Sequence, residues 1–455
     1  MKIGLVSCSN GQPPEQKKNI SQLIQILSDM GISAVTAKHF YAKDGIFGGT
    51  AKERAEALMT FYQDKSIDAV FDVSGGDLAN EVLAFLDYGI IAGLEKMFWG
   101  YSDLTAIINA VYAKTGRASV LYQVKNLVRD NTGLQRKQFQ ASVTGTKKDL
   151  YQIRYTFLQG QKMEGTVTGG NIRCLLKLAG TPYWPDMQGK ILLLESLGAG
   201  IPQTAAFFSQ LEQMGVFKQV SGILLGTFTK LEQSENAQTP FQLLSSHIPP
   251  ALPVARTPDI GHSPDAKAIV IGSFQRFSEI KTKRLTLKPL GMQYLNTSHE
   301  YTKDPENTKY MLYLPNDTIE DTIQFLEDTD REWQKKEPSY YEFAILYRDT
   351  ISGTGDTLHI GSIGIELNAE KNEAEFGWII SKKYWNRGIA FEAAQALLSY
   401  ARQELRIPHF TAHCDSENTA SYHVMEKLGM KRTAVYGGRK NKQSQEERTE
   451  YLYRL

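Results

Sequence analysis

The first half of the chain alternates between short apolar runs and longer amphipathic ones. The apolar runs at 3–7, 32–36 and 69–73 have the length and composition of buried strands. Between them, the runs at 20–27 and 51–63 repeat their apolar positions at helical spacing. Strands that alternate with helices in this way predict a parallel sheet covered by helices on both faces, which is an α/β fold. The reactive groups of such a sheet lie beyond the carboxyl ends of its strands.

A further apolar run begins at Phe98, ends abruptly at Ser102 and passes into a helix. The helix is marked by apolar residues at i, i+3, i+4 and i+7, namely Leu104, Ile107, Ile108 and Val111. A serine at such a corner has its hydroxyl lifted out of the sheet, beside free N–H groups and the positive end of the helix dipole. These are the features of a nucleophile elbow. Serine and aspartate are also common helix caps, so Ser102 and Asp103 have a simpler interpretation as well.

Three other polar positions follow apolar runs. A glycine pair that includes Gly76 follows the third strand, Glu195 ends a later strand, and His262 lies in a loop beyond another. Each has an ordinary explanation: a tight turn, a carboxylate at the rim of the sheet, or a solvated loop histidine. Together, Ser102, Glu195 and His262 form the set that a serine hydrolase uses, since an imidazole activates the hydroxyl and a carboxylate orients the imidazole. The sequence does not show that they meet in space.

The second half has a different pattern, and we place the domain boundary near residue 278. Helices and strands follow one another without strict alternation, and the runs at 360–367 and 374–381 alternate like paired antiparallel strands, which predicts an α+β domain. Segment 376–393 passes from a strand through a basic turn into a helix. The N–H groups at that helix start belong to Arg387, Gly388, Ile389 and Ala390. Such groups suit a pyrophosphate, although most helix starts with nearby lysines bind nothing.

Composition limits the partners of the protein. The 455 residues carry a net charge of +1, so nothing favours a nucleic acid or an acidic membrane surface. No apolar run approaches the ~20 residues of a membrane-spanning helix, and the first residues indicate a strand rather than a signal peptide. The three cysteines are far apart and lack metal-ligand spacing. We therefore expect no metal, no disulfide framework and a reducing compartment, by default the cytoplasm.

Six segments of the first half form a series: SGGDLANEVL (74–83), GYSDLTA (100–106), GGN (169–171), GTPY (180–183), LLLES (192–196) and GH (261–262). In this order they make residues 1 to about 275 resemble the serine peptidase family of the LD-carboxypeptidases and microcin C immunity peptidases. The resemblance implies a flavodoxin-like lobe at about 1–150 and a small β-rich lobe at about 151–278, usually in a homodimer. It implies a Ser102 nucleophile, a His262 general base and a Glu195 that orients the base. The backbone N–H groups of Gly76 and Asp103 would form the oxyanion hole.

Some positions depart from the LD-carboxypeptidase pattern. That pattern carries an arginine before the glycine pair, where this chain has Ser74, and an aspartate after the carboxylate, where it has Ser196. Segments 87–88 and 112–116 are closer to the immunity peptidases, which cleave an amide in aminoacyl-nucleotide antibiotics. The resemblance therefore favours that branch.

Four segments carry a second resemblance: TKRLTLKPL (282–290), EFGW (375–378), YWNRGIAFEA (384–393) and NTASYHVMEKLGM (418–430). They make residues 279–455 resemble the GNAT-type N-acetyltransferases. The resemblance implies that 387–390 bind the pyrophosphate of acetyl-CoA and that Asn418 contacts its pantetheine arm. Ser421 or Tyr422 would protonate the leaving thiolate, and Glu375 would accept the amine proton, unless Glu375 is only a strand residue in a surface ion pair.

We therefore predict a fusion of two enzymes, an amide hydrolase that acts through an acyl-enzyme and an N-acetyltransferase that uses acetyl-CoA. The substrate would be a small molecule or a peptide, and both reactions can disarm one toxic aminoacyl-nucleotide of the microcin C type. Two alternatives remain open. The first domain could trim murein peptides beside an acetyltransferase of unrelated substrate, or it could be an inactive binding module that presents a substrate to the acetyltransferase.

Overall fold

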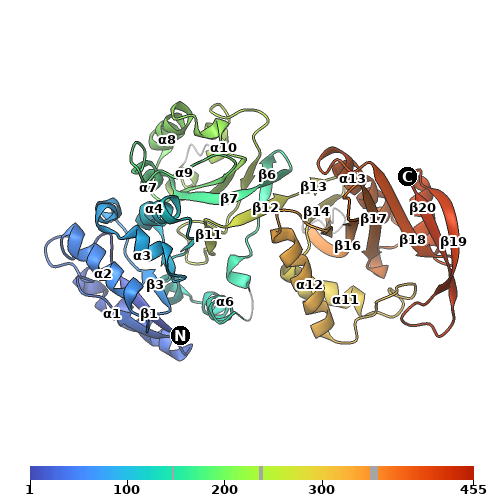
Figure 1. Cartoon of the computed structure of the whole chain (residues 1–455), viewed down its shortest axis with the longest axis horizontal. Coiled ribbons are helices and arrows are strands. Elements are labelled where there is room, and N and C mark those ends of the chain that lie inside the picture. Colours follow the sequence, from blue (N-terminus) through green and yellow to red (C-terminus); the bar gives the residue numbers. More distant parts are fainter. Residues whose placement is uncertain (146–147, 235–238, 349–356) are drawn as a thin grey trace. The chain divides into compact units, whose positions relative to one another are not determined.

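The computed structural model describes residues 1–145, 148–234, 239–348 and 357–455 (Figure 1). The chain divides into two compact units, Met1–Gln275 and Arg276–Leu455. The division falls within strand β12 (Phe274–Ser278), close to the boundary predicted near residue 278. Among the described residues, no helix combines the length and the apolar character needed to cross a membrane.

The first unit begins with the expected parallel sheet. Its six strands run in the order β11-β5-β4-β3-β1-β2, and all neighbours are parallel except β11 and β5. The strands are β1 (Lys2–Val6), β2 (Ser33–Thr36), β3 (Ala69–Asp72), β4 (Met97–Gly100), β5 (Ser119–Leu121) and β11 (Ile269–Ile271). The helices of this lobe are α1 (Lys17–Asp29), α2 (Ala51–Gln63), α3 (Tyr88–Ala92), α4 (Thr105–Thr115), α5 (Asn126–Arg129) and α6 (Leu134–Val143).

Helices cover both faces of this sheet, as the alternating pattern predicts. Ile3 and Leu5 of β1 share one core cluster with Leu23 of α1. On the opposite face Gly4 leaves room for Phe61 of α2, because a Cβ at Gly4 would lie 2.3 Å from the Phe61 ring. The carboxyl ends of β1, β3 and β4 therefore meet at one edge of a sheet that is buried on both sides.

A second six-stranded sheet completes the first unit, in the order β12-β7-β8-β9-β10-β6. Its strands besides β12 are β6 (Thr156–Gln159), β7 (Lys162–Asn171), β8 (Ile191–Ser196), β9 (Gly222–Phe228) and β10 (Val254–Arg256). The run β7-β8-β9-β10 is parallel. Its helices are α7 (Ile172–Leu176), α8 (Ile201–Gln213), α9 (Thr229–Glu232) and α10 (Pro240–Leu244). Every residue of β8 is buried, as is typical of a central parallel strand.

The second unit is one eight-stranded sheet, in the order β13-β14-β15-β16-β17-β18-β20-β19. The strands are β13 (Ile280–Lys281), β14 (Leu285–Pro289), β15 (Tyr340–Arg348), β16 (Thr357–Leu367), β17 (Glu373–Ile380), β18 (His409–Asp415), β19 (Lys431–Arg439) and β20 (Arg448–Arg454). The helices are α11 (Leu295–Thr302), α12 (Ile319–Gln334), α13 (Ile389–Gln403) and α14 (Thr419–Lys427). The predicted antiparallel pair is confirmed as β16 and β17. Short 3₁₀ turns occur at 14–16, 79–85, 102–104, 149–151, 216–218, 292–294 and 382–384.

Strands β17 and β18 form the parallel pair of this sheet. Their ladder runs from Glu373 opposite His409 to Phe376 opposite Ala412, and β17 continues to Ile380 beyond it. The last residues of β17 lead into the turn before α13, and the end of β18 leads into α14. Both helix starts therefore lie beyond the carboxyl ends of the parallel pair, where a ligand can enter between the strands.

Candidate functional sites

Ser102 occupies a tight corner between β4 and α4. Its φ is +56°, a conformation that a residue with a Cβ rarely adopts and that costs on the order of 1–3 kcal/mol. Two residues earlier, a Cβ at Gly100 would lie 2.8 Å from Leu104 Cβ, so the corner has no room for a side chain there. From Phe98 to Val111 every residue is buried except Ser102. A strained turn that exposes one serine has the geometry of a nucleophile elbow.

Glu195 and His262 form a buried pair. Glu195 Oε2 lies 2.9 Å from His262 Nδ1, and the two side chains are 0% and 9% exposed. Gly226 on the neighbouring strand β9 makes room for the carboxylate, because a Cβ there would lie 2.9 Å from Glu195 Cβ. A carboxylate without water is costly unless a hydrogen-bond donor faces it, and the imidazole nitrogen 2.9 Å away is placed to be that donor. With Nδ1 facing Glu195, the other ring nitrogen, Nε2, is left for a reacting group.

Tyr101 connects this pair to Ser102. Its ring meets the His262 ring edge to face, with centroids 4.8 Å apart. Burial raises the pKa of the Tyr101 hydroxyl, and the nearby negative charge of Glu195 raises that pKa further. The structure thus brings Glu195 and His262 together and places the imidazole against the residue that directly precedes Ser102. The sequence does not mark Tyr101 as part of the site, since a tyrosine after a buried strand carries no chemical signature of its own.

The two predicted oxyanion-hole residues lie on turns that face each other across a polar cluster. Gly76 has φ +126°, and a Cβ there would lie 2.2 Å from Asn10 Cγ, so only glycine fits. Among the described residues, no group accepts a hydrogen bond from the N–H of Gly76 or of Asp103. The Asp103 side chain is occupied: its buried carboxylate accepts from Ser9 Oγ at 2.6 Å and from the Ala79 N–H at 2.8 Å. Asp103 therefore ties the glycine turn to the start of α4.

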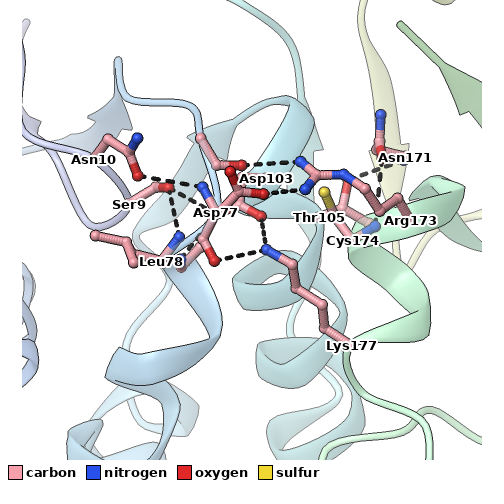
Figure 2. Close-up of polar contacts among 12 residues, drawn as sticks. Ser9, Asn10, Asp77, Leu78, Asp103, Thr105, Asn171, Arg173, Cys174 and Lys177 are labelled. Atoms are coloured by element: carbon pink, nitrogen blue, oxygen red, sulfur yellow. Dashed lines mark hydrogen bonds and ion pairs between the residues drawn. The ribbon is translucent and has the colours of Figure 1, made fainter. Parts of the chain in front are cut away.

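Two basic residues of the second lobe hold the same turn in place (Figure 2). Arg173 Nη2 donates to the Gly76 carbonyl at 3.0 Å, and its guanidinium also pairs with the Asp77 carboxylate, which lowers the pKa of Asp77. Lys177 Nζ donates to the Asp77 carbonyl at 2.8 Å and forms an ion pair with Asp103. The position of the glycine turn is thus fixed from both lobes. The sequence does not mark Arg173 or Lys177, because their role depends on how the lobes pack.

The second unit contains a cavity of about 690 Å³ at the ends of β17 and β18. Six predicted residues line it: Arg387, Gly388, Ile389, Ala390, Asn418 and Ser421. Gly388 is the N-cap of α13 with φ +72°. Arg284 steadies this turn, since it donates to the Arg387 carbonyl at 2.9 Å and pairs with Glu392. The cavity size and the helix start with its N–H groups fit a ligand that carries a pyrophosphate.

The two predicted proton donors of the second unit are placed differently. Asn418 caps α14 by accepting a hydrogen bond from the Ser421 N–H at 3.2 Å, and both residues line the cavity. Tyr422 is not among the described lining residues, and its ring packs against Tyr451 with centroids 6.0 Å apart. The geometry therefore favours Ser421 over Tyr422 as the proton donor.

Glu375 also lies outside the described lining of the cavity. It faces Glu366 across the strand pair, and no cation lies within ion-pair distance of it among the described residues. Desolvation raises the pKa of Glu375, His413 opposes this, and Glu366 is one of the neighbouring carboxylates that add to the rise. A raised pKa suits a proton acceptor. The surface ion pair that was its alternative explanation is thus not seen.

We expect Gly388→Val to weaken acetyl-CoA binding about tenfold, since a β-branched residue at this left-handed position costs on the order of 1–3 kcal/mol and would shift the turn. Calorimetric titration of the full chain measures the Kd. Gly429→Val is the matched control: Gly429 has φ +88°, and a Cβ there would meet one side-chain atom at 3.7 Å, as at Gly388, but Gly429 is not among the described lining residues of the cavity. Equal acetyl-CoA affinities for the two variants would contradict the assignment of this turn.

Among the described residues, no group of three or more His, Cys, Asp or Glu side chains is arranged to hold a metal ion. Both candidate sites are built from side chains and main-chain N–H groups of the chain itself.

The matches to known families divide the chain at nearly the same place as the two structural units do. The LD-carboxypeptidase N-terminal domain matches residues 3–122, the LD-carboxypeptidase C-terminal domain matches 164–277, and the acetyltransferase (GNAT) domain matches 284–431. These matches confirm both resemblances inferred from the sequence.

Individual relatives fall into the same two groups. The microcin C7 self-immunity protein MccF of Escherichia coli is 28% identical over 275 residues, which cover 53% of this chain and 80% of that protein. The probable murein peptide carboxypeptidase of Bacillus subtilis is 29% identical over 284 residues, 60% of this chain and 86% of that protein. The uncharacterized N-acetyltransferase YnaD of Bacillus subtilis is 33% identical over 159 residues, 34% of this chain and 85% of that protein.

Solved structures agree on the fold of the first unit. MccF in complex with glutamyl sulfamoyl guanosine superposes with a TM-score of 0.55 at 23% identity, covering 61% of this chain and 92% of that one. An MccF-like protein from Bacillus anthracis gives a TM-score of 0.54 at 22% identity, covering 62% of this chain and 94% of that one.

Proposed function

We propose, from the premise that the chain belongs to the LD-carboxypeptidase family and carries a fused GNAT N-acetyltransferase domain, that it catalyses two reactions. One domain hydrolyses an amino-acid-derived amide, and the other acetylates it. The observation that carries the hydrolase assignment is the buried pair of Glu195 and His262, whose Oε2 and Nδ1 atoms lie 2.9 Å apart, with the imidazole packed against the neighbour of a half-buried Ser102 at positive φ.

In the first unit, Ser102 Oγ would attack the amide carbonyl while His262 Nε2 takes its proton. The negative charge that develops on the carbonyl oxygen would be stabilised by the N–H groups of Gly76 and Asp103, which have no other described acceptor. His262 would return the proton to the leaving amine, which breaks the C–N bond and leaves an ester on Ser102. A water molecule, deprotonated by the same imidazole, would then release the acid. Glu195 would hold the ring and compensate its positive charge in both steps.

In the second unit, acetyl-CoA is the co-substrate that the GNAT domain implies, and it supplies the acetyl group as a thioester. The N–H groups at 387–390 would bind its pyrophosphate, and Asn418 would contact the pantetheine arm. Ser421, at the start of α14, would protonate the thiolate that leaves. Glu375 would accept the proton of the attacking amine through water, since its raised pKa favours the protonated product.

The substrate that we propose is an aminoacyl-nucleotide of the microcin C type. The similarity to MccF supports this, as does Ser74 at the position where the LD-carboxypeptidase pattern has arginine. The fusion itself supports it too. Hydrolysis of the aminoacyl amide and acetylation of the α-amino group both change the same end of such a molecule, so two reactions in one chain would act on one substrate.

The experiment is a mass-spectrometric assay of three substrates with and without acetyl-CoA: an aminoacyl sulfamoyl adenosine, a murein tetrapeptide and a simple amino acid amide. We expect the nucleotide to be cut without acetyl-CoA and its α-amino group to gain acetyl when acetyl-CoA is present. Cleavage of the tetrapeptide alone would replace this proposal with the carboxypeptidase function. Acetylation without any cleavage would support a first unit that only binds.

A further inference from the structure

A second cavity of the first unit, about 380 Å³ in volume, lies beside the glycine turn. Its wall is formed by the loop after β1, by the first glycine of the turn and by helix α5. The lining residues that matter are Asn10, Gly11, Gln12, Gly75, Lys125 and Arg129. Gly75 directly precedes Gly76, the predicted oxyanion donor, so the cavity and that donor share one turn of the chain, although Ser102 and His262 are not among the described lining residues.

The charged side chains that line this cavity are all positive. Lys125 and Arg129 both line it, and no aspartate or glutamate is among its described lining residues. Neither cation forms an ion pair with a described residue. The nearest polar partner of Lys125 Nζ is Gln12 Oε1 at 3.5 Å, which is the limit of a hydrogen bond. The carboxylate of Asp72 is engaged elsewhere, since it accepts from Cys8 N–H and Ser74 N–H, each at 2.8 Å.

Lys125 is half-buried. Burial lowers the pKa of its ammonium group, the positive charge of Arg129 lowers it further, and Asp72 opposes both. A half-buried ammonium without an ion-pair partner destabilises a fold, because its partial desolvation is not compensated. A bound anion would remove that cost. Asn10 adds a donor, because its Oδ1 accepts from the Asp77 N–H at 3.2 Å and its amide nitrogen remains available.

We propose that this cavity binds a negatively charged group of the substrate, a carboxylate or a phosphate, through Lys125 and Arg129. The inference rests on the proposed hydrolase function, because the cavity is a substrate subsite only if the neighbouring glycine turn binds the amide carbonyl. It also specifies that function: the amide that is cut belongs to a molecule with an anionic group, and Lys125 selects that molecule.

The test is calorimetric titration of the full chain, with coenzyme A present at saturation to fill the cavity of the second unit. The probes are inorganic phosphate, N-acetylglycylglycine, which ends in a carboxylate, and its neutral carboxamide. The variants are Lys125→Met, which keeps the length of the side chain, and the more exposed Arg129→Gln. Lys52→Met is the control, since Lys52 is an exposed lysine of α2 outside the cavity.

We expect at least one anion to bind the wild type and Lys52→Met equally. Lys125→Met should bind it about tenfold more weakly, Arg129→Gln should lose less, and the carboxamide should not bind. The probe that binds identifies the group as phosphate or carboxylate. Failure of both anions to bind, equal affinity of Lys125→Met and wild type, or equal binding of the carboxamide would overturn the proposal. Unfolding midpoints show that the variants are folded.

These outcomes are independent of the hydrolase assignment, because no probe is cut. Hydrolysis that persists in Ser102→Ala would remove the proposed function and leave the anion affinities unchanged. Conversely, loss of hydrolysis in Ser102→Ala with unaltered anion binding in Lys125→Met would keep the proposed function and remove the anion subsite.

Discussion

Ser102→Ala is expected to lower kcat/KM for amide hydrolysis on the order of 10⁴-fold and to leave acetyl transfer at the wild-type rate. The methyl group of alanine cannot attack the carbonyl, and the oxyanion donors and substrate contacts that remain account for only a small part of the rate of a serine hydrolase. Cleavage and acetylation are followed in the same reaction by mass spectrometry, so each variant provides its own internal reference for correct folding.

Ser28→Ala is the matched control, because Ser28 is an exposed serine of α1 far along the chain from the site. It should retain both activities. Hydrolysis by Ser102→Ala at a rate near that of Ser28→Ala would show that another group is the nucleophile, whatever the shape of the elbow.

Glu195→Gln is expected to lower kcat for hydrolysis on the order of 10³- to 10⁴-fold, with little change in KM. The amide cannot compensate the positive charge of the imidazolium, and it can turn the ring to the wrong tautomer. KM should stay unchanged because Glu195 is fully buried and does not touch the substrate. It acts only through His262, whose ring it positions. A lower kcat at an unchanged KM distinguishes this role from a general loss of structure.

A second glutamate–histidine pair provides the control for this variant. Glu212 Oε2 lies 2.6 Å from His247 Nδ1 on the surface of the same lobe, away from the elbow. Glu212→Gln removes a pair of the same chemistry and should leave hydrolysis unchanged. If Glu195→Gln were as active as Glu212→Gln, the buried pair would be structural only.

The sequence was sufficient for those parts of the site that depend on local chain geometry. The strand-to-helix corner at Ser102 follows from apolar spacing, and the structure adds only its positive φ. Residue types alone suggest the pairing of Glu195 with His262, and the structure places the Glu195 carboxylate of β8 in contact with His262 in the loop after β10. Tyr101, Arg173 and Lys177 could not be found in this way, because their importance arises from packing between segments far apart in the chain.

In the second unit, the helix start at 387–390 could be predicted because a turn of backbone N–H groups is a local feature. The roles of single side chains could not. Ser421 and Tyr422 are neighbours on a helix, and the helical pattern alone does not tell that Ser421 lines the cavity while the Tyr422 ring packs against Tyr451. Glu375 alternates with the buried residues Ala374 and Phe376 along β17, and a strand pattern alone does not tell which face the cavity borders.

The catalytic unit of Ser102, His262 and Glu195 is tested most directly by a double-variant cycle of Ser102→Ala and Glu195→Gln, with kcat/KM for hydrolysis measured over long incubations. Groups that act as one catalytic unit lose their effects together, so adding Glu195→Gln to Ser102→Ala should change the residual rate by no more than about twofold. If the two losses instead multiply, the hydroxyl and the carboxylate contribute separately, and the chain does not hydrolyse amides through Ser102, His262 and Glu195.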